Sequence, residues 1–120
     1  MNVIDLSEHL SRISDHWSPH IIAALNGQHV KLARIKGEFP MHAHPEADEL
    51  FLVLDGSMQL EFETHTQDVA QGQLIVVPRG VRHRPLAEEE CCILLFEPEG
   101  TVNTGDAPAD HTTTTGLSLH

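Results

Sequence analysis

Short apolar segments, separated at close intervals by turn residues, run through the middle of the chain. Asn26-Gly27 divides two segments rich in β-branched residues, and Asp55-Gly56 divides another two. Such dipeptides between apolar segments are strong β-hairpin signals. The strands expected on this basis cover residues 20–26, 28–36, 49–54, 58–63, 73–78 and 91–98. Many short strands joined by Gly, Pro and Asn turns predict an all-β sandwich or small barrel.

The ends of the chain differ from this middle part. Apolar residues recur at helical spacing at the N-terminus, and Asp5 with Glu8 three residues later is typical of a capping box. We expect a short helix at about residues 6–14. The organisation expected is an N-terminal helical segment packed on a barrel, the barrel itself, and a polar, Thr-rich tail with a disordered end: residues 1–18, 19–100 and 101–120.

The charge balance excludes one class of partner. The chain of 120 residues has 18 acidic and seven basic side chains, for a formal net charge of −11. A nucleic-acid surface needs clustered Lys and Arg, so no nucleic-acid partner is expected. No segment approaches the roughly 20 apolar residues of a membrane span, and the N-terminus lacks the pattern of a signal peptide. We therefore expect one cytoplasmic domain with no membrane association.

The only two cysteines, Cys91 and Cys92, are adjacent. Their Cα atoms are too close for a relaxed disulfide, and strand alternation directs the two side chains to opposite faces. We interpret them as reduced thiols in core or half-buried positions. A redox or metal role is the less favoured alternative.

Two histidines one residue apart precede the segment at 49–54. On an extended chain His42 and His44 share a face, and imidazole is the commonest metal ligand. Glu49 opens the apolar segment, and Glu is rarely buried unless it is paired or ligating. His83 follows a Pro-Arg-Gly turn that can direct its imidazole inward. These four residues are candidate metal ligands, and solvated side chains are the alternative.

The spacing of these residues resembles that of the cupins, a family of small β-barrels. The first cupin motif reads G, several residues, H-x-H, three or four residues, E, six residues, G. The matching residues here are Gly37, His42, His44, Glu49 and Gly56. The stretch between the first Gly and the first His is one residue shorter than usual.

The second cupin motif reads G, five residues, P-x-G, two residues, H, three residues, N. The matching residues are Gly72, Pro78, Gly80 and His83, and Ala87 stands where the motif has Asn. The two motifs cover about residues 37–87, and flanking strands extend the resemblance to roughly 20–100.

The resemblance implies a cupin β-barrel, a jelly roll or double-stranded β-helix, with a short N-terminal helix. It also implies one divalent transition metal held inside the barrel by His42, His44, Glu49 and His83. Nitrogen and oxygen ligands suit Fe, Mn, Ni, Zn, Co or Cu, and affinity order alone does not choose among them. Three neutral imidazoles and one carboxylate leave a net charge of +1, which favours an anionic or chelating small molecule in the barrel. The catalytic residues are unknown at this stage.

Alternation from Glu49 places Phe51 and Val53 on the ligand face of the strand. The opposite face, with leucines at positions 50, 52 and 54, is also apolar. Such a strand is covered on both sides, so we expect another sheet or a second subunit on the outer face. A homodimer is the expected assembly.

Several charged residues near the motifs have two interpretations. Arg34 and Lys36 share the parity of His42, so they either point inward to bind a substrate carboxylate or are solvated edge-strand charges. Arg84 is a loop charge or lines the mouth of the barrel. Residues 88–90, three consecutive glutamates, are expected to form a solvated turn.

The cupin fold hosts isomerases, dioxygenases, lyases and binding modules, so the fold alone does not decide the function. The leading hypothesis is a metal-dependent enzyme that acts on a small polar molecule, a sugar or a carboxylate, in an isomerase-like or lyase-like reaction. One alternative is an iron-dependent dioxygenase. Another is a non-catalytic small-molecule binding or sensor module. Whether the protein is an enzyme is left open.

Overall fold

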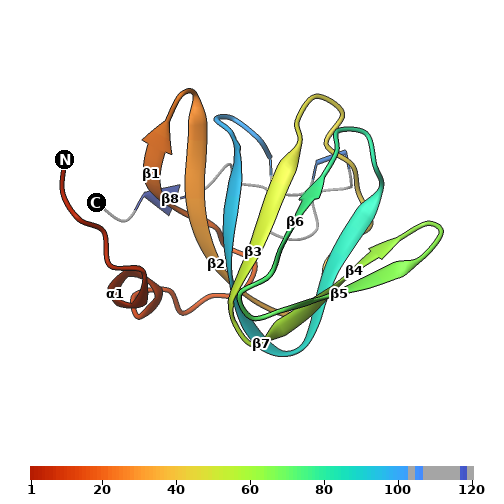
Figure 1. The fold of residues 1–120 in the computed structure, drawn as a ribbon, viewed down its shortest axis with the longest axis horizontal. Helices are drawn as coiled ribbons and strands as arrows, with labels where there is room; N and C mark the ends of the chain where they lie inside the picture. Colours follow the sequence, from red (N-terminus) through yellow and green to blue (C-terminus); the bar gives the residue numbers. More distant parts are fainter. Residues whose placement is uncertain (103–104, 107–116, 119–120) are drawn as a thin grey trace.

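The structure, a computed structural model, describes residues 1–102, 105–106 and 117–118. Within these residues one helix precedes a series of strands (Figure 1). The elements are α1 (Leu6–Leu10), β1 (His20–Leu25), β2 (Gln28–Glu38), β3 (Glu49–Asp55), β4 (Ser57–Phe62), β5 (Thr66–Ala70), β6 (Leu74–Val77), β7 (His83–Pro98) and β8 (Leu117–Ser118). The mostly β fold with a short N-terminal helix agrees with the sequence prediction.

The long strand β7 joins the two halves of the barrel. Its first part pairs with β4, where Phe62 lies opposite His83. Its second part lies between β2 and β3 and pairs antiparallel with both. The sheet has the order β5-β4-β7-β2-β1-β8; β3 also pairs with β7, and β6 pairs with β3. Together the strands curl around a common interior (Figure 1).

The expected hairpin turns are present. Asn26 and Gly27 connect β1 to β2 with φ values of 50° and 75°. Gly56 connects β3 to β4 with φ of 84°, and a Cβ there would lie 3.0 Å from the carbonyl oxygen of Glu90. Gly is therefore required at this turn both by its backbone conformation and by the close approach of β7.

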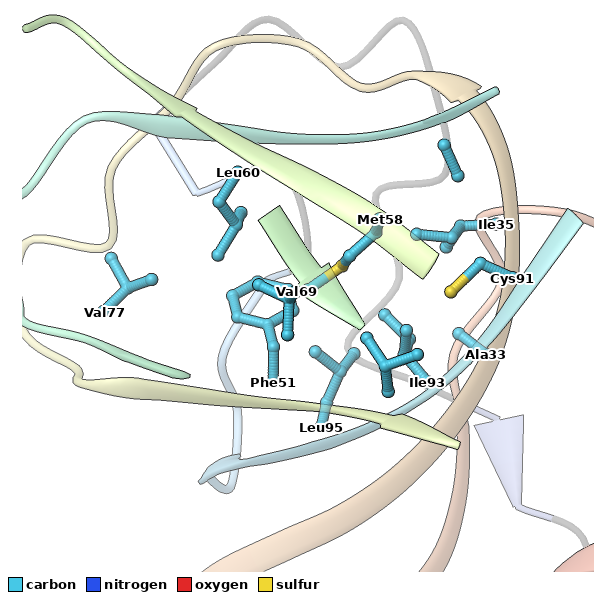
Figure 2. Close-up of a cluster of buried hydrophobic side chains, with 12 residues drawn as sticks. Ala33, Ile35, Phe51, Met58, Leu60, Val69, Val77, Cys91, Ile93 and Leu95 are labelled. Carbon is cyan, nitrogen blue, oxygen red and sulfur yellow. The ribbon is translucent and has the colours of Figure 1, made fainter. Parts of the chain in front are cut away.

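The interior of the barrel is filled by apolar side chains from both halves. Phe51 and Val53 of β3 are buried, as predicted by alternation from Glu49, while the leucines of this strand face outward. Figure 2 shows Phe51, Ile93 and Leu95 facing Met58, Leu60 and Val69 across the core. This packing fixes the strands from which the candidate site is built.

Helix α1 is shorter than expected and lies outside the barrel, beside β2 (Figure 1). The backbone N–H of Glu8 donates to Asp5 Oδ1 at 3.1 Å, which confirms the predicted N-cap. The helix ends at Leu10, and the chain continues through turns to Ile13, which is buried against the outer side of the sheet.

The prediction that residues 88–90 form a turn is wrong, because β7 already begins at His83. Pro85 and three consecutive glutamates are typical of a loop, but Leu86 pairs with both β4 and β2. The register with β2 shifts between Ile35 and Gly37, so the glutamates lie at an irregularity of the ladder, where they remain exposed. The sequence analysis also did not predict strand β5.

Part of the C-terminal tail contacts the barrel. The N–H of Asp106 donates to the Ala43 carbonyl at 3.1 Å, and the N–H of Ala43 donates to Asp106 Oδ1 at 2.8 Å. Strand β8 pairs parallel to β1. The expected disorder of the tail's end falls on residues outside the described ranges. None of the helical segments in the described part is long and apolar enough to cross a membrane.

Candidate metal centre

The structure brings the four predicted ligands together inside the barrel. His42 and His44 lie in the segment between β2 and β3, Glu49 is the first residue of β3, and His83 is the first residue of β7. All four side chains are buried, and one potential ligand atom from each lies within 4.8 Å of the others. Residues separated by up to 41 positions therefore form one cluster, as the two cupin motifs predicted.

Backbone hydrogen bonds hold the two motifs against each other. His42 and His83 form an antiparallel bridge in which each N–H donates to the other's carbonyl, at 2.9 and 2.8 Å. Such a pair directs both side chains to the same face, and the ring centroids lie 4.5 Å apart. The N–H of Gly80, in the turn of the second motif, donates to the carbonyl of His44 at 2.9 Å.

The imidazole rings are oriented for metal binding. His42 Nδ1 lies 2.8 Å from the Pro40 carbonyl, and His83 Nδ1 lies 2.9 Å from the Val81 carbonyl. A carbonyl only accepts, so Nδ1 carries the proton in both rings and Nε2 presents its lone pair to the cluster. Metal-ligating histidines in proteins usually show this arrangement.

Three of the cluster's polar atoms are buried without a hydrogen-bond partner: His44 Nε2, Glu49 Oε1 and His83 Nε2. Both Nε2 atoms lie near Glu49 Oε1, at 3.3 and 3.4 Å, which is long for a charge-assisted hydrogen bond of about 2.7–2.9 Å. An unsatisfied buried polar atom costs about 1–3 kcal/mol. A cation in the cluster would satisfy all three, so these residues fit a divalent metal with nitrogen and oxygen ligands.

The ionisation of the cluster also matches a metal site. Burial lowers the pKa of His42 from 6.5 to about 4, and the neighbouring histidines lower it further. Burial alone would raise the pKa of Glu49, but the neighbouring side chains of Glu97, His44 and His83 hold it well below its ordinary value. His42 is therefore neutral and Glu49 ionised near neutral pH, which are the forms that bind a metal.

A second buried charged group adjoins the ligands, and the sequence analysis did not identify it. Lys31 Nζ of β2 lies 2.9 Å from Glu97 Oε1 of β7, and the two side chains are 0% and 1% exposed. Burial, together with the neighbouring carboxyl of Glu49, raises the pKa of Glu97 to about 9. The sequence did contain one signal for Glu97. It lies two positions after Leu95 and four after Ile93, so on an extended strand it shares the face of these buried residues.

A cavity of about 40 Å³ lies next to two of the ligands, His42 and Glu49. Its remaining lining residues are apolar: Trp17, Pro19, Ala33, Ile35, Phe39, Phe51, Pro85, Ile93 and Leu95. Trp17 comes from the N-terminal segment, where its indole N–H donates to the Lys36 carbonyl at 2.9 Å. The sequence analysis did not place Trp17 near the site, and no local motif indicated it.

The two basic residues considered for an inward role point elsewhere. Arg34 donates to the carbonyls of Leu10 and Ile13 at 2.9 and 2.8 Å and pairs with Glu90, so it fastens the N-terminal segment to the outer face. Lys36 is exposed. Arg34 and Lys36 do not share the inward face with His42, because the pairing of β2 with β7 shifts register after Ile35 and an irregular segment follows.

Arg84 and the two cysteines lie in strand β7. Arg84 pairs with Glu38 and Glu61 at 3.4 and 3.2 Å and does not line the cavity beside the ligands. Both cysteines are free and buried, as predicted, and burial raises the pKa of the Cys91 thiol to about 12. A thiol so hard to ionise is a poor nucleophile and ligand, so Cys91 is a packing residue.

A small β-barrel that encloses a cluster of three histidines and one glutamate defines a class of protein with a candidate metal site. The sequence model described as Cupin domain matches residues 28–96, which is more than half of the chain. The chain belongs to the cupin family.

Two solved structures have a similar fold. The crystal structure of a cupin-2 domain containing protein from Shewanella frigidimarina is 40% identical, with a TM-score of 0.79 over 80% of this chain and 94% of that one. A Neisseria meningitidis protein is 30% identical, with a TM-score of 0.75 over 81% of this chain and 99% of that one.

Curated relatives match over shorter regions. Germin-like protein 1 of Brassica napus is 41% identical over 83 residues, which are 59% of this chain and 40% of the relative. The uncharacterized protein YdbB of Bacillus subtilis (strain 168) is 36% identical over 64 residues, which are 52% of this chain and 57% of the relative. The chain spans less than two thirds of the length of either relative.

Proposed function

We propose that this cupin is a divalent-metal-dependent enzyme that acts on a small carboxylate in an isomerase-like or lyase-like reaction. The observation that carries the proposal is the set of buried, unpartnered ligand atoms on His44, Glu49 and His83 beside a small, largely apolar cavity. A divalent metal held there supplies Lewis acidity, which polarises an oxygen atom of a bound molecule. The net charge of +1 of the loaded site favours an anionic or chelating group.

The cavity favours a carboxylate over a sugar. At about 40 Å³ it is far below the roughly 300–1,000 Å³ of typical ligand pockets, so it admits only a few atoms. Its wall away from the ligands is apolar and offers no partners for several hydroxyl groups. A short molecule with one charged end at the metal ligands and an apolar body against Phe39 and Phe51 fits this wall.

An iron-dependent dioxygenase is a second candidate, and one feature of the cavity supports it. Among the described lining residues, only His42 and Glu49 can transfer a proton, and both are candidate ligands. A reaction that moves protons needs a base near the substrate, whereas a reaction with dioxygen does not depend on a separate side-chain base. The apolar wall also offers water no hydrogen-bond partners.

We also propose that the protein is a homodimer. Leu74 and Val76 of β6 are exposed large apolar residues, at 57% and 50%, next to the outward-facing leucines of β3. An apolar strip of this kind on a sheet is covered by a second subunit in many proteins. Light scattering should give twice the chain mass, and a monomer mass for the wild-type protein contradicts the proposal.

The enzymatic proposal is tested on protein stripped of metal and reloaded separately with Fe(II), Mn(II), Co(II), Ni(II), Cu(II) or Zn(II). Each form is incubated with short 2-oxo and 2-hydroxy carboxylates, with product formation followed by NMR and oxygen uptake by electrode. Ala33→Leu is the matched control, since it narrows the cavity and leaves the four ligands in place.

Metal-dependent turnover that Ala33→Leu removes supports the proposal, and oxygen uptake with iron assigns the dioxygenase alternative. Tight carboxylate binding without turnover assigns a binding module instead. If no metal-loaded form binds or converts any carboxylate, the proposed substrate class is wrong.

A further inference from the structure

We propose that the buried Lys31–Glu97 pair is a positioning element that holds the carboxylate of Glu49 in its metal-binding orientation. The inference rests on the proposed metal site and assigns a role to two residues that bind no metal themselves. Neither residue is among those that line the cavity beside the ligands. Leu50 of β3 pairs with Phe96 of β7, so the adjacent residues Glu49 and Glu97 are neighbours, and the pair adjoins the site there.

Strand order places the three side chains in one row. β7 lies between β2 and β3, and Leu95 pairs with Lys31 on one side and with Phe51 on the other. Alternation then puts Glu97 and Glu49 on the same inward face as Lys31, which burial confirms. The row runs from the ammonium group of β2, across Glu97, to the ligand on β3.

A hydrogen bond between Lys31 and Glu97 restrains the Glu97 carboxyl group. Glu97 Oε1 accepts from Lys31 Nζ at 2.9 Å, which fixes the plane of the Glu97 carboxyl. Glu97 Oε2 is buried without a hydrogen-bond partner, and the register of β3 with β7 makes Glu49 its neighbour on the inward face. The Glu97 carboxyl therefore packs against Glu49. Glu49 is thereby restrained with Oε1 near His44 and His83.

Stability alone does not explain the pair. Removing an ammonium and a carboxyl group from water is costly, and apolar residues of similar volume commonly replace such a buried pair without loss of stability. The pair lies in an otherwise apolar wall formed by residues such as Ile93 and Leu95. What an apolar replacement cannot supply is a hydrogen-bonding group against Glu49. Groups that orient a ligand in this way typically affect metal affinity by about 10- to 100-fold.

The test compares three variants. In the double variant Lys31→Met/Glu97→Leu, apolar groups replace the pair and no lone charge is left buried. Glu97→Gln keeps a donor for Glu49 and an acceptor for Lys31. Val69→Ala is the control, because it truncates a core residue on β5 that is neither a member of the pair nor a candidate ligand. Each metal-free protein is checked for folding by thermal melting, its Co(II) and Zn(II) affinities are measured by competition, and the Co(II) absorption spectrum is recorded.

The proposal predicts that the double variant is folded, binds both metals about 10- to 100-fold more weakly and shows an altered Co(II) spectrum. Glu97→Gln should stay within a few-fold of wild type, and Val69→Ala should lower the melting temperature without changing affinity or spectrum. Wild-type affinity and spectrum in the double variant overturn the proposal, as does an equal loss in Glu97→Gln. If the wild-type protein itself binds neither metal, the proposed metal site fails, which is a separate result.

Discussion

Adding metal to the metal-free protein should raise its melting temperature strongly. The three unpartnered atoms of the cluster, on His44, Glu49 and His83, destabilise the metal-free fold, and the unfolded chain has no preformed site. At a free metal concentration 100-fold above the dissociation constant, binding stabilises the native state by about 2.7 kcal/mol. With an unfolding entropy of about 2.1 cal/mol/K per residue, a cooperative unit of about 100 residues should melt roughly 13 °C higher.

The assay is differential scanning fluorimetry or calorimetry of chelator-treated protein with Zn(II), Mn(II), Co(II) or Ni(II). His44→Ala is the matched control, and its shift is measured against its own metal-free form. Mg(II) is a second control, since it prefers oxygen ligands in octahedral geometry and should produce little shift. A wild-type shift below about 3 °C for every transition metal, at saturating concentration, refutes the reasoning. So does an equal shift in His44→Ala.

Three further predictions concern acidity, the buried pair and a turn. Folding lowers the pKa of His42 from 6.5 to about 4 in the metal-free protein. Between these pH values the unfolded chain binds a proton at His42 and the folded protein does not. The free energy of unfolding should therefore fall by about 3 kcal/mol as the pH drops from 6.5 to about 4. Urea unfolding should show the stability difference between wild type and His42→Asn shrinking between pH 7 and pH 4, and a constant difference contradicts this. Glu97→Leu should lose about 3–5 kcal/mol because it strands a buried ammonium. Lys31→Met should lose less, because Glu97, with its pKa raised to about 9, carries no charge near neutral pH that the loss of Lys31 would strand; the reverse order contradicts the account. Gly56→Ala should destabilise more than Gly72→Ala, because both have positive φ but only the first would press a Cβ against β7, and equal losses by calorimetry contradict it.

Features with a local signature were predictable from the sequence. The turn at Asn26-Gly27 and the alternation of β3 follow from residue type and period, and both are present in the structure. The ligand cluster was predictable because the cupin motifs combine short-range spacing with Pro and Gly turns. In the fold, the antiparallel bridge between His42 and His83 brings the two motifs into contact.

Features that depend on strand register were not predictable. A single sequence gives no sign that Lys31 and Glu97 face each other across β2 and β7, since both residue types are usually exposed. The shift of the ladder after Ile35 changed the side on which Arg34 points relative to the ligands. The approach of Trp17 to the cavity depends on how the N-terminal segment packs on the barrel, which leaves no local motif.

The central claim is that His42, His44, Glu49 and His83 bind one divalent metal ion. The most direct test is the metal content, by inductively coupled plasma mass spectrometry, of protein purified without affinity tags or chelators, with His44→Ala prepared in parallel. The account predicts close to one equivalent of a transition metal in the wild-type protein and its loss in the variant. A wild-type protein that contains none, and that cannot be loaded with iron, manganese, nickel or zinc, contradicts the claim.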